Sequence, residues 1–312
     1  MIVDLFLILA GLVALVVGGE FLVRGAVAMS LRLGLPPLIV GLTVVAFGTS
    51  APEMIVSVAA VLNGSPDMAL GNVVGSNIAN ILLVLGLPAL IAGIPTRDVD
   101  LRESWVLMVG ASLLLIAMAW MGPIGRMQGL ILLVTLGLVI WRQITTARRD
   151  GAAVPELEAG SGTTVAGWPR ILIWLAIGLI ALPLGGQVLV TGATDIARVF
   201  GISEAVIGLT LVAVGTSLPE LATSVIAAIR GRADLALGNV IGSNIFNILS
   251  ILGITALIDA LPVPEQMLNR DLWIMLATAL LPAPFLFRRW PINRPVGAAF
   301  IAAYGLYVGA ML

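Results

Sequence analysis

One long stretch occurs twice in this chain, and no other feature of the sequence limits the possible folds as much. The first copy, 34–86, contains GTSAPEM and GNVVGSNIAN, and the second copy, 201–253, contains GTSLPEL and GNVIGSNIFN. Glu53 aligns with Glu220, and this offset of 167 residues (220 − 53) holds without a gap through both copies. The matching positions include the polar ones, namely Thr49/Thr216, Ser50/Ser217, Glu53/Glu220, Asn72/Asn239, Ser76/Ser243, Asn77/Asn244 and Asn80/Asn247. Two apolar segments whose polar residues recur in register predict two halves of one ion site.

The composition places the chain in a membrane. It has 312 residues, of which 60% are hydrophobic and 11% are charged, whereas soluble domains carry about 25% charged residues. Basic and acidic residues number 16 and 17, so the net charge indicates no nucleic-acid partner. The chain has no cysteine and no histidine. Disulfides and thiolate metal sites are therefore excluded, and the usual near-neutral proton carrier is missing.

Apolar segments that could cross a bilayer follow one another along the chain. About 20 apolar residues span the hydrocarbon core. On that ruler we predict ten helices, at about 3–25, 37–62, 68–93, 103–120, 124–143, 169–192, 204–229, 235–258, 271–287 and 291–311. The N-terminus lacks a basic region and a cleavage site, so we expect a first spanning helix there and not a signal peptide. The predicted fold class is an all-α integral membrane protein.

Each copy of the repeat extends over five predicted helices. The motif Gly-Gly-Glu at 18–20 matches Gly-Gly-Gln at 185–187 at the same offset, so the repeat reaches back into the first helix. The expected domains are a first repeat at 1–143, a cytoplasmic linker at 144–168 and a second repeat at 169–312. An odd number of helices turns the second copy upside down, which predicts an inverted repeat.

The arginines test this topology. All 16 basic residues are arginine. With the N-terminus outside, only Arg126, Arg198 and Arg270 fall on the outer side, and the other thirteen (16 − 3) fall on the inner side. This bias follows the positive-inside rule. It predicts a multi-pass protein of the cell inner or plasma membrane, with both termini outside and the linker in the cytoplasm.

Two glutamates lie deep inside predicted spans. A carboxylate at the depth of Glu53 or Glu220 costs several kcal/mol unless it is paired or solvated, so it is by default a functional-site hypothesis. The alternative is a structural salt bridge, but no arginine falls at midspan in any predicted helix. Glu20 differs, because it can pair with Arg24 at i, i+4 near a helix end. We interpret Glu20 as structural.

A proline precedes each of the two acids. Pro52 and Pro219 remove a backbone N–H and clash with the carbonyl four residues back. We therefore expect the second and seventh helices to be broken around Thr49-Ser50 and Thr216-Ser217, leaving carbonyls, hydroxyls and carboxylates together. Irregular backbone at membrane depth survives where it faces protein or a water-filled cavity. The alternative is a simple kink with hydroxyls bonded back to the helix.

The following helix of each repeat, the third and the eighth, is expected to be broken as well and to carry further oxygen ligands. Ser76 and Asn80 stand at i, i+4 and share a face, as do Ser243 and Asn247. We interpret these four as ion contacts, with interhelical hydrogen bonding as the alternative. Four more asparagines are outer candidates that could instead hold the broken helices together: Asn72, Asn239, Asn77 and Asn244.

Oxygen ligands without nitrogen or sulfur select hard cations. Flexible carboxylates, carbonyls and hydroxyls suit Ca²⁺ better than Mg²⁺, which demands a near-ideal octahedron. Two carboxylates are neutralised by one Ca²⁺ or by two Na⁺, so the two ion types exclude each other, which is the physical basis of exchange. Inverted repeats with broken helices are the layout of secondary transporters. No phosphate-binding loop is present, so we expect neither ATP drive nor an enzyme.

The double motif resembles a known family. GTSAPEM with GNVVGSNIAN, and GTSLPEL with GNVIGSNIFN, resemble the two alpha-repeats of the calcium/cation antiporter superfamily, the sodium/calcium exchangers in particular. The resemblance covers all ten predicted helices. It implies one calcium site with flanking sodium sites, and a gating unit formed by the first and sixth helices, here 3–25 and 169–192.

The resemblance also implies roles for individual residues. Glu53 and Glu220 would coordinate Ca²⁺ and share Na⁺, and the carbonyls of Thr49 and Thr216 would complete the calcium site. Asn80 and Asn247 would line the central position. The flanking sodium sites would be lined by Ser50, Ser217, Ser76 and Ser243 and by the carbonyls of Ala46 and Ala213.

One position departs from the family pattern. Many members carry aspartate where this chain has Asn247, so the site has one charge fewer, which argues against a potassium-dependent subtype. The departure also leaves room for a Ca²⁺/H⁺ exchanger, although the Gly-Ser-Asn pattern fits that branch less well.

From these observations we expect a monomeric antiporter in membrane lipid that exchanges Ca²⁺ for Na⁺ by alternating access. Its partners are these transported ions, with no other cofactor. The alternatives are Ca²⁺/H⁺ exchange and, in a different class, a cation channel.

Overall fold

The structure is a computed structural model that describes residues 2–149, 166–201 and 213–311. Across these ranges it contains helices and no β-strand. Within the described part of the chain, seven helices are long and apolar enough to cross a membrane, or eight if one bent pair counts as a single span. The protein is thus an all-helical membrane protein, as predicted.

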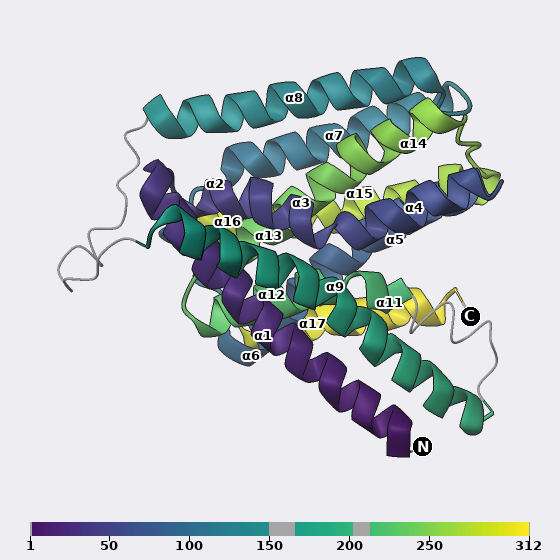
Figure 1. The fold of residues 1–312 in the computed structure, drawn as a ribbon. Helices are drawn as coiled ribbons and strands as arrows, with labels where there is room; N and C mark the ends of the chain where they lie inside the picture. Colours follow the sequence, from purple (N-terminus) through teal and green to yellow (C-terminus); the bar gives the residue numbers. More distant parts are fainter. Residues whose placement is uncertain (1, 150–165, 202–212, 312) are drawn as a thin grey trace.

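Two long helices form one side of the molecule. α1 (Ile2–Leu33) and α9 (Trp168–Val199) pack side by side and antiparallel (Figure 1). A Cβ added to Gly11 would lie 2.7 Å from the Gly185 carbonyl oxygen, so the two backbones are close enough to require glycine. Both helices extend beyond the predicted ranges 3–25 and 169–192. The predicted ranges counted only the residues needed to cross the hydrocarbon core of a bilayer. Each helix instead continues almost to a glycine in the left-handed region, Gly34 at φ 63° or Gly201 at φ 74°.

The second span is broken at one residue. α2 (Pro37–Val40), a π-helical turn η1 (Gly41–Val45) and α3 (Ala46–Thr49) lead to Ser50, after which α4 (Ala51–Leu62) leaves at a bend of 43°. In the second repeat, α11 (Ala213–Thr216) and α12 (Leu218–Ile229) are broken in the same way at Ser217. The first part of the predicted helix 204–229 lies outside the described residues. Each proline is the second residue of a new helix. The N–H groups of the first helical turn have no partner within the helix, so a proline at this position costs no hydrogen bond.

The next span of each repeat differs from the expectation of a break. α5 (Pro66–Ala79), η2 (Asn80–Val84) and α6 (Gly86–Ala92) form one span, and so do α13 (Ala233–Phe246), η5 (Asn247–Ile251) and α14 (Leu252–Ile258). In both spans a π-helical turn replaces the break and begins at the asparagine. The Leu85 N–H donates to the Asn80 carbonyl at 3.0 Å. No proline falls within either turn, so the helix widens by one residue instead of opening.

The remaining helices enclose this centre. They are α7 (Arg102–Trp120), α8 (Arg126–Arg149), η6 (Met267–Asp271), α15 (Leu272–Leu280), α16 (Ala283–Arg288) and α17 (Arg294–Gly309). Within the most apolar window of the α13–α14 span 83% of residues are buried, against 22% in α1. The core therefore lies around α5 and α13, and α1 presents most of its side chains to the surroundings.

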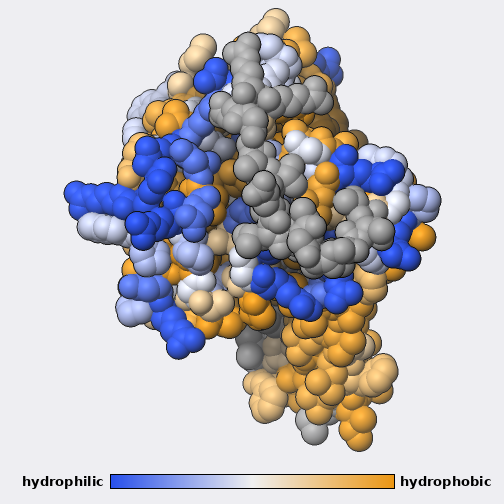
Figure 2. Space-filling model, turned by 90° about the vertical axis from the view of Figure 1, so that its left-hand side faces the viewer, coloured by the Kyte–Doolittle hydropathy of each residue, from blue (hydrophilic) through white to orange (hydrophobic). Residues whose placement is uncertain are grey.

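The two ends of the bundle differ. α1 begins and α17 ends at one end, whereas α8 ends and α9 begins at the opposite end (Figure 1). Figure 2 shows this opposite end, where hydrophilic residues gather above an apolar flank. A polar end beside an apolar flank is expected of a chain that crosses a bilayer.

Candidate cation site

The two glutamates occupy equivalent positions at the start of two helices. Glu53 is the third residue of α4 and Glu220 the third residue of α12. Both glutamates are buried: Glu53 is 1% exposed and Glu220 is fully buried. Each carboxylate thus lies at a helix N-terminus, where unpaired N–H groups and the helix dipole favour negative charge. The break at Ser50 or Ser217 creates that N-terminus in the middle of the protein.

Each carboxylate is bonded by the other repeat. The Ser50 hydroxyl donates to Glu220 Oε1 at 3.0 Å, and the Ser217 hydroxyl donates to Glu53 Oε1 at 3.3 Å. Because each serine lies three residues before its own glutamate, these crossed bonds bring the two breaks face to face. Among the described residues no arginine forms an ion pair with either acid. The structural salt bridge considered from the sequence is therefore not formed there.

Several buried oxygens around these acids have no hydrogen-bond partner. They are Glu53 Oε2, Glu220 Oε2, Asn80 Oδ1, Asn247 Oδ1 and the hydroxyl of Ser243. A buried polar atom without a partner costs about 1–3 kcal/mol. Four of the five are pure acceptors, and a hard cation is the species that would satisfy such a group. The described residues contain no group of three or more acidic, histidine or cysteine side chains that could hold a metal ion. Two carboxylates among neutral oxygens form a site of low charge, which suits an ion that must leave again.

The remaining predicted ligands lie on α3, α5, α11 and α13. Ser76 is buried in α5, one turn before Asn80, and Ser243 is buried in α13, one turn before Asn247. Thr49 ends α3 and Thr216 ends α11, directly before the two breaks, and Ala213 begins α11. The crossed serine bonds join the two breaks directly, and α13 packs on α3 as α5 packs on α11.

One predicted carbonyl already has partners. The Ala46 carbonyl accepts the Ser50 N–H at 3.0 Å and the Thr49 hydroxyl at 3.3 Å. A carbonyl oxygen has two lone pairs, so Ala46 would have to release one donor before binding an ion. Thr49 has a second acceptor available, because its hydroxyl also donates to Asn239 Oδ1 at 3.1 Å.

Two asparagines donate hydrogen bonds to backbone carbonyls and serine hydroxyls of the broken spans, and not to the carboxylates of the two acids. Asn72 Nδ2 donates to the Glu53 carbonyl at 3.2 Å and to the Ser57 hydroxyl at 2.9 Å. In the second repeat, Asn239 Nδ2 bonds the Glu220 carbonyl at 3.3 Å and Ser224 at 3.0 Å. Ser57 and Ser224 were missed from the sequence, although they match at the repeat offset one helical turn after each glutamate.

The other asparagine pair connects the two repeats. Asn77 Nδ2 donates to the Asn244 carbonyl at 3.3 Å, and Asn247 Nδ2 donates to Asn77 Oδ1 at 3.1 Å. Beyond them, Asn77 and Asn244 reach the sulfur atoms of Met275 and Met108, which are themselves equivalent in the repeat. These bonds leave the side-chain oxygen of Asn247 without a partner.

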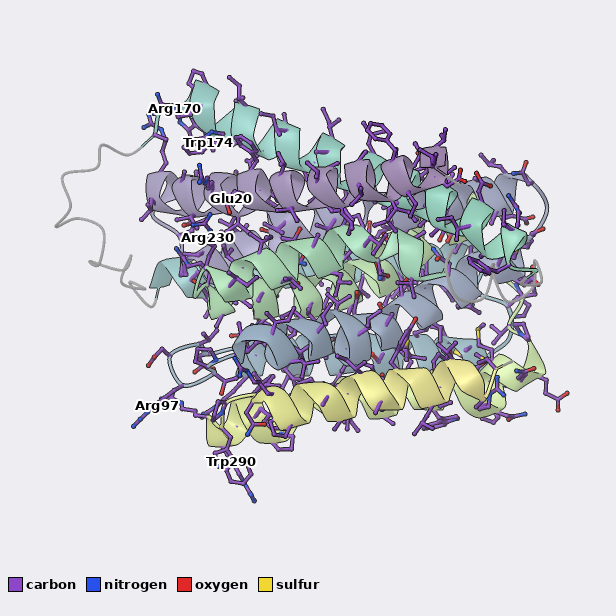
Figure 3. The ribbon with its side chains drawn as sticks, turned by 90° about the horizontal axis from the view of Figure 1, so that it is seen from below. Glu20, Arg97, Arg170, Trp174, Arg230 and Trp290 are labelled. Carbon is purple, nitrogen blue, oxygen red and sulfur yellow. The ribbon has the colours of Figure 1, made fainter. Side chains whose placement is uncertain are left out.

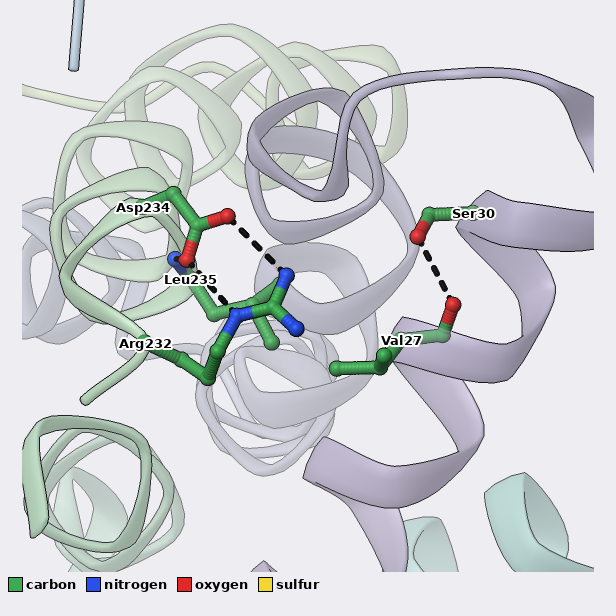
Figure 4. A network of polar contacts seen from close by, with 5 residues as sticks. All are labelled: Val27, Ser30, Arg232, Asp234 and Leu235. Atoms are coloured by element: carbon green, nitrogen blue, oxygen red, sulfur yellow. Dashed lines mark hydrogen bonds and ion pairs between the residues drawn. The ribbon is translucent and has the colours of Figure 1, made fainter. Parts of the chain in front are cut away.

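Two acids away from this region are paired with arginine. Glu20 pairs with Arg24 on its own helix and with Arg230 at the end of α12 (Figure 3), in line with the structural role inferred for it. Arg232 donates to both carboxylate oxygens of Asp234, at 3.2 and 3.1 Å (Figure 4). Neither acid is free to act as a cation ligand.

The whole chain is similar to proteins of one family. Residues 3–145 and 170–312 each match the family described as sodium/calcium exchanger protein. The inner membrane protein YrbG of Escherichia coli is 39% identical over 311 residues, which cover 98% of this chain and 95% of the relative. The sodium/calcium exchanger MaX1 of Methanosarcina acetivorans is 32% identical over 337 residues, covering 97% of this chain and 96% of the relative.

A solved structure agrees with these relatives. The sodium-calcium exchanger NCX_Mj soaked with zero Na⁺ and Ca²⁺ superposes with a TM-score of 0.85 at 32% identity, covering 100% of this chain and 99% of the other. The two family matches correspond to the two copies of the repeat. The resemblance inferred from the two motifs is therefore confirmed.

Proposed function

The chain belongs to the sodium/calcium exchanger family, and from this premise we propose that it exchanges Ca²⁺ for Na⁺ across the membrane by alternating access. Family membership makes the protein a Ca²⁺/cation antiporter. The coupling to Na⁺ is the part that we propose. It is supported by a donor set of oxygen atoms alone in a chain without histidine.

The observation that carries the proposal is the facing pair of buried acids. Glu53 and Glu220 each keep one oxygen without a hydrogen-bond partner in a region that also holds unpaired amide oxygens. With both carboxylates ionised the pair carries −2, which one Ca²⁺ or two Na⁺ neutralise. A site that holds either set and cannot hold both must release one before it binds the other.

We assign the ligands by their place in this arrangement. Glu53 and Glu220, with the carbonyls of Thr49 and Thr216, would bind Ca²⁺ and share Na⁺. Asn80 and Asn247 would line the centre through their unpaired side-chain oxygens. The flanking sodium sites would use the hydroxyls of Ser50, Ser217, Ser76 and Ser243 and the carbonyls of Ala46 and Ala213.

The topology completes the proposal. Ten spans would form two inverted repeats, 1–143 and 169–312, joined by a cytoplasmic linker at 144–168. The end of the bundle where α8 ends and α9 begins would face the cytoplasm, since it holds hydrophilic residues that include Arg170 and Arg230 (Figures 2 and 3). Both chain termini would then lie outside. We propose that the protein works as a monomer in membrane lipid, because one chain supplies both halves of the site.

Ion flux in reconstituted vesicles tests the proposal. Purified protein is placed in proteoliposomes, and uptake of ⁴⁵Ca²⁺ is measured with an outward Na⁺ gradient and, separately, with an outward proton gradient. We expect uptake with the Na⁺ gradient alone. Uptake driven by the proton gradient alone would replace Na⁺ coupling by Ca²⁺/H⁺ exchange, and flux without any counter-ion would indicate a channel.

A further inference from the structure

The α1–α9 pair packs on one repeat at a defined place. A Cβ added to Gly19 would lie 3.1 Å from Ile226 Cγ1 and 3.3 Å from the Ala222 carbonyl oxygen. α1 thus covers a face of α12, the helix that carries Glu220. We call this face, formed by Ala222 and Ile226, the α12 dock.

The equivalent face of the first repeat is open. The repeat offset relates Ala222 to Ile55 and Ile226 to Ala59, both on α4. Both of these residues are exposed, Ile55 to 69%. Gly186 of α9 is the counterpart of Gly19, yet a Cβ added to it would lie nearest the Gly215 carbonyl oxygen and Leu218 Cβ, at 3.4 and 3.6 Å. We call the open face, formed by Ile55 and Ala59, the α4 dock.

An ion pair crosses the α12 dock and has no counterpart at the α4 dock. Arg230 bonds Glu20 through two nitrogens, Nε at 3.0 Å and NH2 at 2.7 Å, which joins α1 to the end of α12 (Figure 3). The repeat replaces Glu20 by Gln187 and Arg230 by Asn63. These replacements are uncharged, so the α4 dock can form a neutral contact at most. The two docks therefore differ in strength although their backbones are related by the repeat.

We propose that Glu20 and Arg230 are positioning residues that set the balance between the two access states of the transporter. Their ion pair would hold the α1–α9 pair on the α12 dock. In the opposite state, α9 would pack on the α4 dock, with Gln187 facing Asn63. This inference rests on the proposed alternating access, because inverted repeats allow each half to take the arrangement of the other.

The size of the bias follows from the ion pair. Glu20 is largely buried in this contact, whereas more than half of the Arg230 side chain is exposed. A partly exposed ion pair shifts an equilibrium by about two- to fivefold. A ligand or contact acts on such an equilibrium only through its different strength in the two states. The Glu20–Arg230 pair meets this condition, since it can form at the α12 dock alone.

Thiol labelling of the two docks tests the proposal without measuring transport. The chain has no cysteine, so Ala59→Cys and Ile226→Cys each report on one dock, and the two positions are exact counterparts. With the ion pair intact we expect Ala59→Cys to react faster with N-ethylmaleimide than Ile226→Cys. Glu20→Gln and Arg230→Asn install the residues of the other repeat. Each should raise labelling at 226 and lower it at 59, changing the ratio of rates by about two- to fivefold.

Arg24→Gln is the matched control. Arg24 also pairs with Glu20, but along α1, so its loss leaves the bridge to α12 intact. It should leave the ratio of labelling rates unchanged. The double variant Glu20→Arg with Arg230→Glu restores a bridge of reversed polarity and should return the ratio toward its original value.

Two outcomes would overturn the inference. Labelling ratios that do not change in Glu20→Gln and Arg230→Asn would show that the pair sets no balance. Faster labelling at both positions together would indicate loosening of the fold and not a shift between docks. A failure of the proposed function looks different, because a protein without ion exchange could still show opposite changes at the two docks.

Discussion

Ser50 donates a hydrogen bond to the carboxylate of Glu220 at 3.0 Å, so the hydroxyl of one repeat holds the acid of the other. The reciprocal bond from Ser217 to Glu53 is 3.3 Å long. Each break in a helix therefore supplies a glutamate to the shared site and a hydroxyl to its neighbour. Neither repeat can form the arrangement alone, which explains why the chain contains both copies.

Removal of either buried charge should stop exchange. Glu53→Gln and Glu220→Gln keep the side-chain shape and one oxygen but lose the charge that neutralises the cation. Loss of a group that only bonds a metal ligand lowers metal affinity or activity by about 10- to 100-fold. Loss of the charge of the ligand itself should therefore decrease Na⁺-dependent ⁴⁵Ca²⁺ uptake by more than that. Because neither acid has an arginine partner among the described residues, thermal unfolding without ions should begin no earlier than in the unaltered protein. A Glu220→Gln protein that exchanges normally would remove the assignment of the site.

The crossed serine bonds should affect ion affinity unequally. Ser50→Ala removes the hydroxyl that donates to the buried carboxylate of Glu220. Hydrogen bonds to charged groups contribute about 1.5–3 kcal/mol, so we expect the affinity for Ca²⁺ to fall by about tenfold or more. Ser217→Ala should have a smaller effect, because its bond to Glu53 is longer. The Ca²⁺ concentration for half-maximal uptake checks both. Ser50→Thr keeps a hydroxyl and serves as the control, and equal affinities for Ser50→Ala and Ser50→Thr would contradict the role of the bond.

The sequence predicted the two buried acids and the helix breaks beside them better than the bonds between the repeats. The repeat register identified Glu53 and Glu220, and the prolines located the breaks, because both signals depend on residue type and spacing. The crossed serine bonds depend on how the two repeats pack, which no local pattern encodes. The π-helical turns at Asn80 and Asn247 also escaped prediction, since a one-residue widening of a helix has no residue signature comparable to proline.

Helix length and the supporting residues show the same limit. The bilayer length ended the predicted first helix near residue 25, but α1 continues to Leu33, and its last turn places Arg32 over the Trp168 ring of α9. Ser57 and Ser224 matched at the repeat offset, yet a lone serine on a helix is common and gave no reason to select them. Their role appears only through Asn72 and Asn239.

Asn239 should be a stability residue more than a transport residue. Its side chain is fully buried and bonds the Glu220 carbonyl, the Ser224 hydroxyl and the Thr49 hydroxyl. Asn239→Ala removes the bonds to the Glu220 carbonyl and the Ser224 hydroxyl, whereas the Thr49 hydroxyl keeps the Ala46 carbonyl as its acceptor. Each buried group left unsatisfied costs about 1–3 kcal/mol. We expect thermal unfolding at a lower temperature, measured in detergent, with residual exchange in the fraction that folds. Unchanged unfolding of Asn239→Ala would contradict the fastening role.

The closest backbone approach at the site offers the sharpest steric test. A Cβ added to Gly242 of α13 would lie 2.6 Å from the Leu42 carbonyl oxygen and 2.7 Å from Ala46 Cβ. Backbone cannot yield as a flexible side chain does, so Gly242→Ala must push α13, with Ser243, away from η1 and α3. Overpacking of this kind costs about 1–3 kcal/mol, and the shift should also lower exchange, since Ser243 and Ala46 are both assigned to the site.

Gly137→Ala in α8 is the control for Gly242→Ala, because a Cβ there would meet no heavy atom within 4 Å. Alanine exceeds glycine in helix propensity by about 1 kcal/mol, so Gly137→Ala should unfold at the same or a higher temperature and exchange normally. Unfolding temperature and ⁴⁵Ca²⁺ uptake, measured for both variants, separate the two effects. If Gly242→Ala matched Gly137→Ala in both measurements, the contact between α13 and the first repeat would not position the site.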